Sequence, residues 1–395
     1  MATTATRRLA LLGSTGSIGR QAVDVVARAG GRLRITALAA GRDVDALATQ
    51  AASLAPAAIA LERPDDPAAA ERRLRDAAPR ARVYVGEGAS ARMVRDLDVD
   101  VVLNGIVGSA GLEASLVTLE RGMRLALANK ETLVVGGPLV RAALARGGEL
   151  LPVDSEHSAA LQCLGGRPPS EVAKLVLTAS GGPLRTHSDW RRATREEVLA
   201  HPVWSMGARI TVDSALMFNK GLEMIEAHWL FDVEMKRVEV VVHPQSIVHS
   251  MVEFADGSTL AQLSYSNMRF PIQYAVTWPD RVANTLPPLD FSKLSRLEFF
   301  TPRYEDFPAL NLARQAGEIG GTLPAVMNAA NEVAVAGFLD RQVRFPDIWQ
   351  IVEAVMNHHT SVAHPDLDAI LQADQWARKE AHRHVKSIKE LQRQT

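Results

Sequence analysis

The chain has 395 residues, which is long for one hydrophobic core, so we expect two or three domains. Apolar residues make up 47% and charged residues 23%, a composition that excludes collagen-like and wholly disordered chains. The formal charge is −1, from 44 basic and 45 acidic residues, so the chain has no overall positive field that would attract nucleic acid or acidic membranes. We expect neither as a partner.

The single cysteine, Cys163, excludes an internal disulfide and a cysteine-based zinc site, and it suits a reducing compartment. The first apolar run, Leu9–Leu12, is too short for the core of a signal peptide. No later run approaches the length of a membrane span. We therefore expect a cytoplasmic protein.

Short apolar runs alternate with helical stretches over residues 1–150. The runs are Leu9–Leu12, Ile35–Leu38, Ala58–Leu61, Val83–Val85, Val101–Leu103 and Leu125–Leu127. This alternation indicates parallel strands joined by crossover helices, and continuous apolar runs are typical of strands covered on both faces. The sequence predicts an α/β protein whose N-terminal domain, residues 1–150, is a Rossmann-like, doubly wound parallel sheet.

Longer, β-branched strands follow in residues 151–280, for which we expect a mixed α/β domain. Two of these strands are Lys174–Thr178 and Val238–Val242. A hairpin through an Asp-Gly turn is predicted for Ile247–Phe254 and Thr259–Ser264. Residues 281–305 contain several prolines and read as a linker. Residues 306–395 have helical spacing, with helices expected at Ala325–Leu339, Ile348–Asn357 and Trp376–Leu391, and predict a C-terminal helical domain.

A glycine-rich turn, Gly13-Ser-Thr-Gly16-Ser-Ile-Gly19, follows the first strand and opens a helix. In that context backbone N–H groups and the helix dipole bind a pyrophosphate, although a turn with no ligand is the alternative. The second strand ends in Gly41-Arg42-Asp43. Arg42 suits the 2′-phosphate of NADPH, so we favour NADPH over NADH, with an exposed loop arginine beside Asp43 as the alternative.

Two carboxylates, Asp154 and Glu156, stand two residues apart, and in an extended segment they point to the same side. Hard oxygen ligands on one face suit Mg²⁺ or Mn²⁺. The alternative is a helix start with Ser155 as N-cap and Glu156 in the first turn. From these residues alone the alternative is favoured.

The segment 213–229 predicts one amphipathic helix capped by Asp213 or Ser214. Its polar side carries Asn219, Lys220, Glu223 and Glu226. A solvated face with a Lys–Glu pair is the simple interpretation of that side. Gly221 argues against it, because glycine disfavours a helix interior and the close approach of a ligand would explain its presence.

Two other segments are candidate binding elements. Thr178–Pro183 follows a strand and offers a hydroxyl and free N–H groups for an anion, or is only a tight turn. Residues 184–209 form a long connection that predicts a lid, unless its indole and thioether are merely buried. No pattern of acids or cysteines completes a metal site around the last group of histidines, and we expect solvated side chains without a role at His358, His359, His364, His382 and His384.

Seven motifs in register closely resemble the 1-deoxy-D-xylulose 5-phosphate reductoisomerase family over nearly the whole chain. They are Gly13–Gly19, Asn129–Glu131, Leu151–His157, Ser180–Gly182, His201–Gly207, Asn219–Glu223 and His243–Gln245. The resemblance implies a homodimeric enzyme that uses NADPH and Mn²⁺ or Mg²⁺. It also implies the reaction, a skeletal rearrangement of 1-deoxy-D-xylulose 5-phosphate followed by reduction to 2-C-methyl-D-erythritol 4-phosphate, on a route to isoprenoid precursors.

The same resemblance implies roles for individual residues. The metal ligands would be Asp154, Glu156 and Glu223, which with Lys130 form the catalytic group. The substrate would be held by Lys130, Ser155, Glu156, Ser180, His201, Trp204, Met206, Ser214, Asn219, Lys220 and Glu223, with Trp204 and Met206 in a mobile lid. The cofactor would contact Gly13, Ser14, Thr15, Gly16, Ser17, Ile18, Gly41, Arg42, Asn129, Glu131 and Gly207.

Asp43 departs from the family pattern, because many relatives have a neutral residue after the basic one, and a carboxylate there should weaken contact with a 2′-phosphate. Leu184 replaces a common phenylalanine, which should affect packing only. One rival hypothesis is another NADP-dependent oxidoreductase with a cysteine nucleophile or a Tyr-x-x-x-Lys pair; Cys163 lies in an ordinary helical stretch and no tyrosine has that lysine. The other is a non-enzymatic NADPH sensor, which would need the glycine turn but not the acids.

Overall fold

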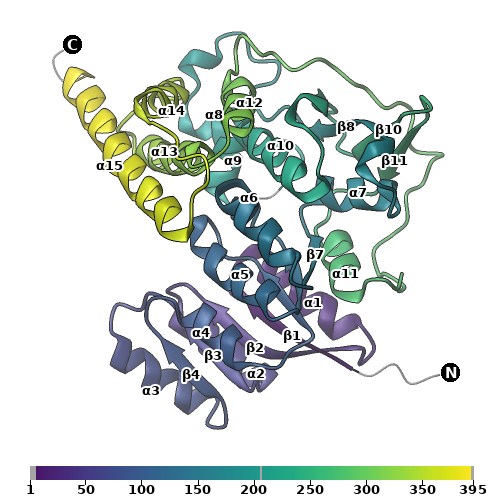
Figure 1. Ribbon diagram of the computed structural model, residues 1–395, viewed down its shortest axis with the longest axis vertical. Coiled ribbons are helices and arrows are strands. Elements are labelled where there is room, and N and C mark those ends of the chain that lie inside the picture. The colour runs from purple at the N-terminus through teal and green to yellow at the C-terminus, as the bar shows by residue number, and fades with distance from the viewer. Residues whose placement is uncertain (1–5, 205–206, 393–395) are drawn as a thin grey trace. The chain divides into compact units, whose positions relative to one another are not determined.

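The computed structural model describes residues 6–204 and 207–392 (Figure 1). It divides into two compact units. The first comprises the chain up to Thr132 with Pro138–Ser158 and Asn267–Pro288, and the second comprises Leu133–Gly137, Ala159–Ser266 and the chain from Leu289 onward. This division differs from the expected one, since residues 267–288 group with the N-terminal unit and the expected central and helical domains form a single unit.

The first unit is built on a seven-stranded parallel sheet, as the sequence predicts. Its order is β4-β3-β2-β1-β5-β6-β7. The strands are β1 (Arg7–Leu12), β2 (Leu33–Ala40), β3 (Ala58–Leu61), β4 (Arg82–Val85), β5 (Val101–Asn104), β6 (Arg124–Leu127) and β7 (Glu149–Pro152), of which β7 was not expected. The strand order reverses between β1 and β5, and in open parallel sheets ligands bind at the carboxyl ends of strands beside such a reversal.

Crossover helices join these strands, as right-handed parallel connections require. They are α1 (Ser17–Arg28), α2 (Val44–Leu54), α3 (Pro67–Ala77), α4 (Ala89–Asp96), α5 (Leu112–Glu120) and α6 (Glu131–Leu144), while α11 (Arg269–Thr277) contacts α1 and β6. Aspartates begin two of these helices: Asp43 and Asp66 accept hydrogen bonds from Ala46 N and Ala69 N, each at 3.0 Å. Such caps satisfy N–H groups that the helix itself leaves unpaired.

The second unit contains a four-stranded mixed sheet in the order β11-β10-β8-β9. Its strands are β8 (Val172–Ala179), β9 (Val238–Val242), β10 (Val248–Phe254) and β11 (Thr259–Leu263). The β8–β9 pair is parallel and the other pairs are antiparallel. The expected hairpin is confirmed: Gly257 has φ +83° in its turn, where Asp256 Oδ1 accepts from Ser258 N at 2.9 Å.

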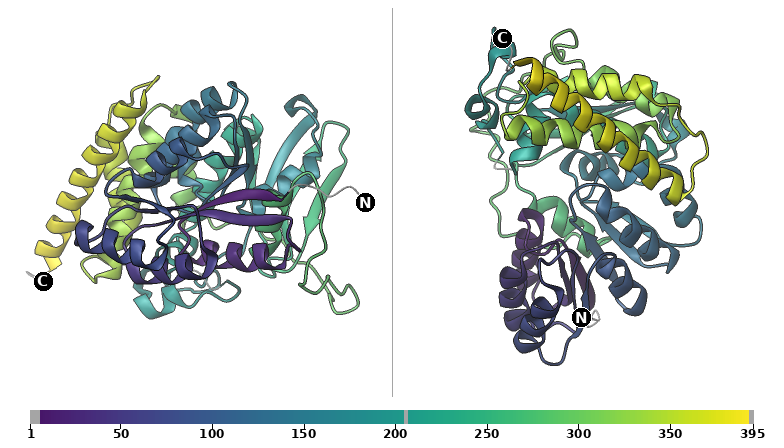
Figure 2. Two further views of the ribbon diagram at one scale, coloured as in Figure 1. Left: turned by 90° about the horizontal axis from the view of Figure 1, so that it is seen from below. Right: turned by 90° about the vertical axis from the view of Figure 1, so that its left-hand side faces the viewer.

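Helices make up the rest of the second unit. They are α7 (Ser155–Leu164, which begins in the first unit), α8 (Arg195–Leu199), α9 (Ala208–Ala215), α10 (Phe218–Phe231), α12 (Ala309–Ile319), α13 (Leu323–Leu339), α14 (Asp347–His358) and α15 (Leu367–Gln392). The expected C-terminal helices are confirmed, although α15 begins at Leu367 instead of Trp376. The largely buried α13 is contacted by α14 and by α15, the yellow C-terminal helix (Figures 1 and 2). Among the described residues, no helix is both long enough and apolar enough to cross a bilayer.

The expected single helix over residues 213–229 is wrong. Met217 takes a left-handed conformation, with φ +66°, and separates α9 from α10, so that Asp213 and Ser214 lie inside α9 and Met217 stands at the N-cap position of α10. The ligand-based explanation for Gly221 is wrong as well. A Cβ atom at Gly221 would lie 2.7 Å from Ala313 Cβ of α12, so this glycine is needed for close helix packing.

A partly buried charge network fixes α9 against the C-terminal helices. Arg209 Nη1 lies 3.1 Å from Glu332 Oε1 of α13, and Arg378 Nη2 of α15 lies 2.7 Å from Glu332 Oε2. Burial alone would raise the pKa of Glu332, but the two guanidinium groups outweigh it and hold that pKa below its ordinary value. Asn331 Nδ2 also donates to Asp213 Oδ1 at 2.6 Å. Helix α9, which follows the proposed lid, is therefore anchored by charged side chains of α13 and α15.

Candidate active site

The glycine turn between β1 and α1 has the shape of an anion cradle. Gly13 has φ +75°, and a Cβ there would lie 2.5 Å from the Gly105 carbonyl oxygen. A Cβ at Gly19 would lie 2.3 Å from the Ser14 carbonyl oxygen. Gly16 is the N-cap residue of α1 and supplies no side-chain cap to its first N–H groups. The turn fits the pyrophosphate of a dinucleotide.

Ser14 within this turn and Arg42 after β2 also fit a dinucleotide. The Ser14 side chain is fully buried, and its Oγ has no hydrogen-bond partner among the described residues. Arg42 is exposed directly after β2, at the carboxyl edge of the sheet. Asp43 caps α2 with the same carboxylate that was expected to oppose a 2′-phosphate. A hydrogen bond to its own helix therefore accounts for this departure from the family pattern.

Asn129 holds a loop that the sequence analysis missed. Its side-chain amide donates to the carbonyl oxygens of Ile106 and, at 2.8 Å, Gly108, while its Oδ1 accepts from Thr132 N at 2.9 Å. Residues 105–108 follow β5 beside the strand-order reversal, and Val107 is 63% exposed there. The signal in the sequence was the Asn-Gly step at the end of a buried strand. Asn129 thus shapes the rim of the glycine turn by holding the backbone of the 105–108 loop.

Neighbouring parallel strands bring Lys130 and Asp154 together, because Lys130 follows β6 and Asp154 follows β7. Lys130 Nζ lies 2.5 Å from Asp154 Oδ2, and His157 Nδ1 lies 3.4 Å from Asp154 Oδ1. The expectation of an extended Asp154–Glu156 segment is wrong, because α7 begins at Ser155 and the Asp154 carbonyl accepts from Ser158 N. The chain adopts a helix start here, as in the alternative, but Ser155 is the first residue of α7 and not its N-cap.

Glu156 lies in the first turn of α7, where Ser155 Oγ donates to Glu156 Oε2 at 2.5 Å. Asp154, Ser155 and Glu156 are all only partly buried. This part of the first unit therefore presents two carboxylates and an ammonium group within one short stretch of the sheet edge. Carboxylate oxygens of this kind are suitable ligands for Mg²⁺ or Mn²⁺.

The polar side of α10 is buried, so the simple interpretation of a solvated face is wrong. Lys220 is 4% exposed and Glu223 is 1% exposed. Lys220 Nζ forms an ion pair with Glu223 Oε2, and Asn219 Nδ2 donates to Glu223 Oε1 at 2.5 Å. Burial of an ion pair is costly, so an arrangement of this kind commonly marks a functional position.

A second group of polar side chains gathers at the end of β8. Ser180 Oγ lies 3.0 Å from His201 Nε2 and accepts from Gly182 N at 3.1 Å. Gly182 has φ +68°, and a Cβ there would lie 2.8 Å from the Ser214 carbonyl oxygen. Ser180, His201 and Ser214 are therefore adjacent in the second unit, as the resemblance implies for a common binding site.

The contacts of His201 define its tautomer. Its Nδ1 accepts from Val203 N at 3.2 Å and from Trp204 N at 2.9 Å, so the proton of the neutral ring is on Nε2 and is donated to Ser180. Burial lowers the pKa of His201 below its ordinary value. The ring is consequently a neutral donor near pH 7.

The expected lid, residues 184–209, is partly packed. Leu184 is buried, which agrees with a packing role. Trp190 is 1% exposed and packs against Phe307 and Phe345. Thr194 is the N-cap of α8 and forms a capping box with Glu197. Helix α8 ends at Leu199 and α9 begins at Ala208, after Gly207.

Trp204 lies in this connection, and its ring centroid is 6.4 Å from that of the buried His249. Gly207 is the residue before α9. Met206, the other expected lid residue, lies outside the described residues. The tryptophan thus has an aromatic neighbour on β10 that the sequence analysis did not single out.

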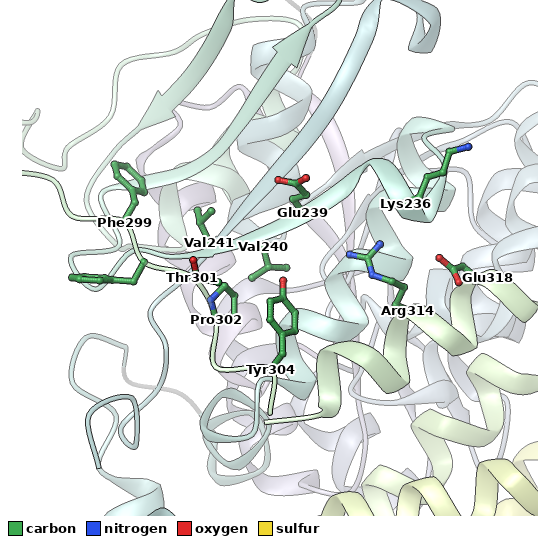
Figure 3. Close-up of a pocket in the computed structure, with 11 residues that line it drawn as sticks. Lys236, Glu239, Val240, Val241, Phe299, Thr301, Pro302, Tyr304, Arg314 and Glu318 are labelled. Carbon is green, nitrogen blue, oxygen red and sulfur yellow. The ribbon is translucent and has the colours of Figure 1, made fainter. Parts of the chain in front are cut away.

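A separate cavity of about 550 Å³ lies beside β9 (Figure 3). Tyr304 and Arg314 line it, but none of the expected site residues does. Arg314 donates to the carbonyl oxygens of Met235 at 2.6 Å and Val238 at 3.0 Å, so its guanidinium group supports the start of β9. The cavity is not part of the candidate active site.

Three family models match the chain in order. One described as 1-deoxy-D-xylulose 5-phosphate reductoisomerase matches residues 9–137, and models of the C-terminal domains of the same enzyme match residues 150–231 and 263–380. A protein of that name from Symbiobacterium thermophilum is 51% identical over 376 residues, covering 94% of this chain and 97% of its own length. The chain belongs to the 1-deoxy-D-xylulose 5-phosphate reductoisomerase family.

Other members of the family agree. The reductoisomerase of Gloeobacter violaceus is 48% identical, covering 94% of this chain and 96% of its own. A solved reductoisomerase complex with NADPH, fosmidomycin and magnesium superposes with a TM-score of 0.92 at 38% identity, covering 97% of this chain and 99% of that one. The Zymomonas mobilis enzyme with NADPH gives 0.89 at 39% identity, covering 97% and 100%. The resemblance seen in the seven motifs is confirmed.

We expect His201 to titrate below pH 6.5, since burial disfavours the imidazolium form. Between the folded and unfolded midpoints the unfolded chain binds more protons, so the free energy of unfolding contributed by His201 should fall as the pH drops below about 6.5. An NMR titration of the His201 ring, assigned by comparison with His201→Gln, measures the midpoint. A midpoint at or above 6.5 in the free protein would contradict the buried neutral ring.

Proposed function

We propose that the chain catalyses the NADPH-dependent conversion of 1-deoxy-D-xylulose 5-phosphate to 2-C-methyl-D-erythritol 4-phosphate, with Mg²⁺ or Mn²⁺, in isoprenoid precursor synthesis. The observation that carries this proposal is family membership over almost the full length of both chains. The glycine cradle, the carboxylates after β7 and the polar groups at the end of β8 support it, since they supply what the cofactor, the cation and a phosphate each require.

For the cofactor, we assign the pyrophosphate to the turn formed by Gly13, Ser14, Thr15, Gly16, Ser17 and Ile18, and the 2′-phosphate to Arg42 beside Gly41. NADPH supplies the hydride when it is bound. The N–H groups at the start of α1 hold the anionic part of the cofactor. Asn129 keeps the 105–108 loop in place, and Glu131 and Gly207 are further contacts in this proposal.

For the metal, we propose Asp154, Glu156 and Glu223 as ligands, because all three offer hard carboxylate oxygens. A divalent cation, when bound, stabilises negative charge that develops on the substrate oxygens. Lys130 orients Asp154 through their 2.5 Å ion pair, and its ammonium group also carries protons for a substrate oxygen. Ser155 adds a hydroxyl at the same edge of the sheet.

For the substrate phosphate, we propose Ser180, Ser214, Asn219 and Lys220, with His201 donating from Nε2. Ser180 and His201 already lie within hydrogen-bond distance, so their donors are organised before binding. Lys220 pairs with Glu223 in the structure, and phosphate binding would therefore exchange this partner. Trp204 and Met206 would exclude water from the reacting groups when the connection between α8 and α9 closes.

NADPH oxidation by the purified protein with 1-deoxy-D-xylulose 5-phosphate tests the whole proposal. We expect turnover only with Mg²⁺ or Mn²⁺, and a loss of roughly 100-fold or more in kcat for Asp154→Asn, because a ligand carboxylate becomes a neutral amide. Asp98→Asn is the matched control, as Asp98 is 85% exposed and should leave the rate unchanged. Tight NADPH binding without turnover under either metal would instead support the sensor hypothesis.

Arg42→Ala should raise the KM for NADPH by about tenfold or more and leave the KM for NADH unchanged, because it removes a charged hydrogen bond to the 2′-phosphate. Asp43→Asn keeps a capping side chain for α2 while it removes the charge, so it should lower the KM for NADPH without changing Tm. Steady-state kinetics with both cofactors measure these effects. Equal changes for NADPH and NADH would remove the assigned role of Arg42.

We further propose that the enzyme is a homodimer that uses the outer edge of β11. Among the described residues β11 pairs with β10 alone, and Leu260 on it is 51% exposed. Such an edge needs a cover in solution. Sedimentation equilibrium should give twice the chain mass, falling to the chain mass in Leu260→Glu but not in Val362→Glu, an equally exposed site off the sheet. A monomeric wild type at micromolar concentration would refute the dimer.

A further inference from the structure

Three potential metal ligands meet where the end of α14 lies beside α15. His358 is the last residue of α14, while Glu380 and His384 stand four residues apart on one face of α15. One ligand atom of each lies within 4.8 Å of the other two. No role was expected for these histidines because no pattern of acids or cysteines completes a site around them in the sequence, and the fold completes one by bringing His358 to Glu380 and His384.

The surroundings of His384 leave a nitrogen available. Its Nε2 is buried, has no hydrogen-bond partner among the described residues, and lies 3.8 Å from Glu380 Oε1. The neighbouring His359 behaves differently, because its Nε2 lies 2.8 Å from Thr322 Oγ1 and is satisfied there. Burying a nitrogen atom without a hydrogen-bond partner costs free energy unless the atom binds something else, such as a ligand or a metal ion.

The arrangement of Glu380 and His358 also suits the binding of a metal ion. Arg383 Nη1 holds Glu380 Oε2 at 2.8 Å, which leaves Glu380 Oε1 on the side of His384. The rings of His358 and His384 lie nearly parallel, with centroids 6.1 Å apart and 17° between their planes. His358 is exposed, so the cluster opens to solvent on its side.

We propose that His358, Glu380 and His384 bind a transition-metal ion of the Zn²⁺ class. Two imidazole nitrogens and one carboxylate oxygen are a donor set for Zn²⁺ and are unsuited to Mg²⁺, which prefers oxygen ligands alone. Ligand distances of about 2.0–2.2 Å require the three side chains to close in by small rotations. Three protein ligands leave a fourth position for water on the exposed side.

The bound ion would join α14 to α15 within the second unit. Both helices contact α13, so the ion would cross-link two of the three helices in this part of the unit. A ligand that binds only the folded state raises stability by mass action. The site is chemically distinct from the all-carboxylate metal site proposed for the reaction, which allows the two to be tested separately.

The test uses the full-length chain in Asp154→Asn form, with millimolar Mg²⁺ present and Zn²⁺ as the probe, so that the proposed reaction site contributes little. Equilibrium dialysis should show about one bound Zn²⁺, with affinity reduced at least tenfold by His358→Ala, Glu380→Gln or His384→Ala. His364→Ala and His382→Ala, both exposed and outside the cluster, are the matched controls and should bind as the parent does.

Two further readouts separate binding from folding. Zn²⁺ should raise Tm in the parent and in both controls but not in His384→Ala, while all variants should share one Tm in EDTA. Co²⁺ in place of Zn²⁺ should give the visible absorption of a four-coordinate ion, which His384→Ala should abolish. Zn²⁺ binding that is unchanged by all three ligand substitutions, or equally lost in His382→Ala, would overturn the proposal. Either result would leave the proposed reaction untouched.

Discussion

The parallel sheet of the first unit imposes the constraint from which the candidate site follows. Parallel strands direct their carboxyl ends to one edge, so residues that follow β1, β5, β6 and β7 must lie along that edge. The glycine turn, the 105–108 loop, Lys130 and Asp154 stand at those four ends. Residues far apart in the sequence thereby become neighbours without any contact that is specific to them.

In the second unit, the polar side chains of the candidate site are positioned by the burial of charged groups. Lys220 and Glu223 are almost completely buried on α10, and Arg209 is linked to Arg378 through Glu332. Removing charges from water costs free energy that pairing only partly offsets. The polar groups are held in defined positions as a result, which suits the proposed binding of a phosphate.

Close packing explains several residues that an interpretation based on ligands alone misassigns. Gly221 allows α10 to approach α12, and Asp43 caps α2. Asn129 braces a loop through backbone carbonyls. Each of these residues lies within a functional motif or directly beside one, yet its contacts are structural. A motif thus combines residues that hold a ligand with residues that hold the backbone around it.

The sequence by itself determined six of the seven strands of the first unit, the hairpin through Asp256 and Gly257, the C-terminal helices and the family. Those features rest on local patterns: apolar runs, turn residues and spacing that any chain segment displays directly. The sequence also placed the glycine turn, because the positive φ of Gly13 and the close contact of Gly19 with the Ser14 carbonyl oxygen both lie within one short segment.

Only the tertiary structure decided which polar residues are buried, where helices break, and which distant side chains meet. Met217 divides α9 from α10 through a left-handed backbone conformation that the hydrophobic periodicity of the sequence does not predict. The pairing of Lys130 with Asp154 and the meeting of Glu380 with His358 depend on the order of strands and the packing of helices. Such contacts arise from the whole fold, because the free energy that brings those residues together comes from burial elsewhere in the chain.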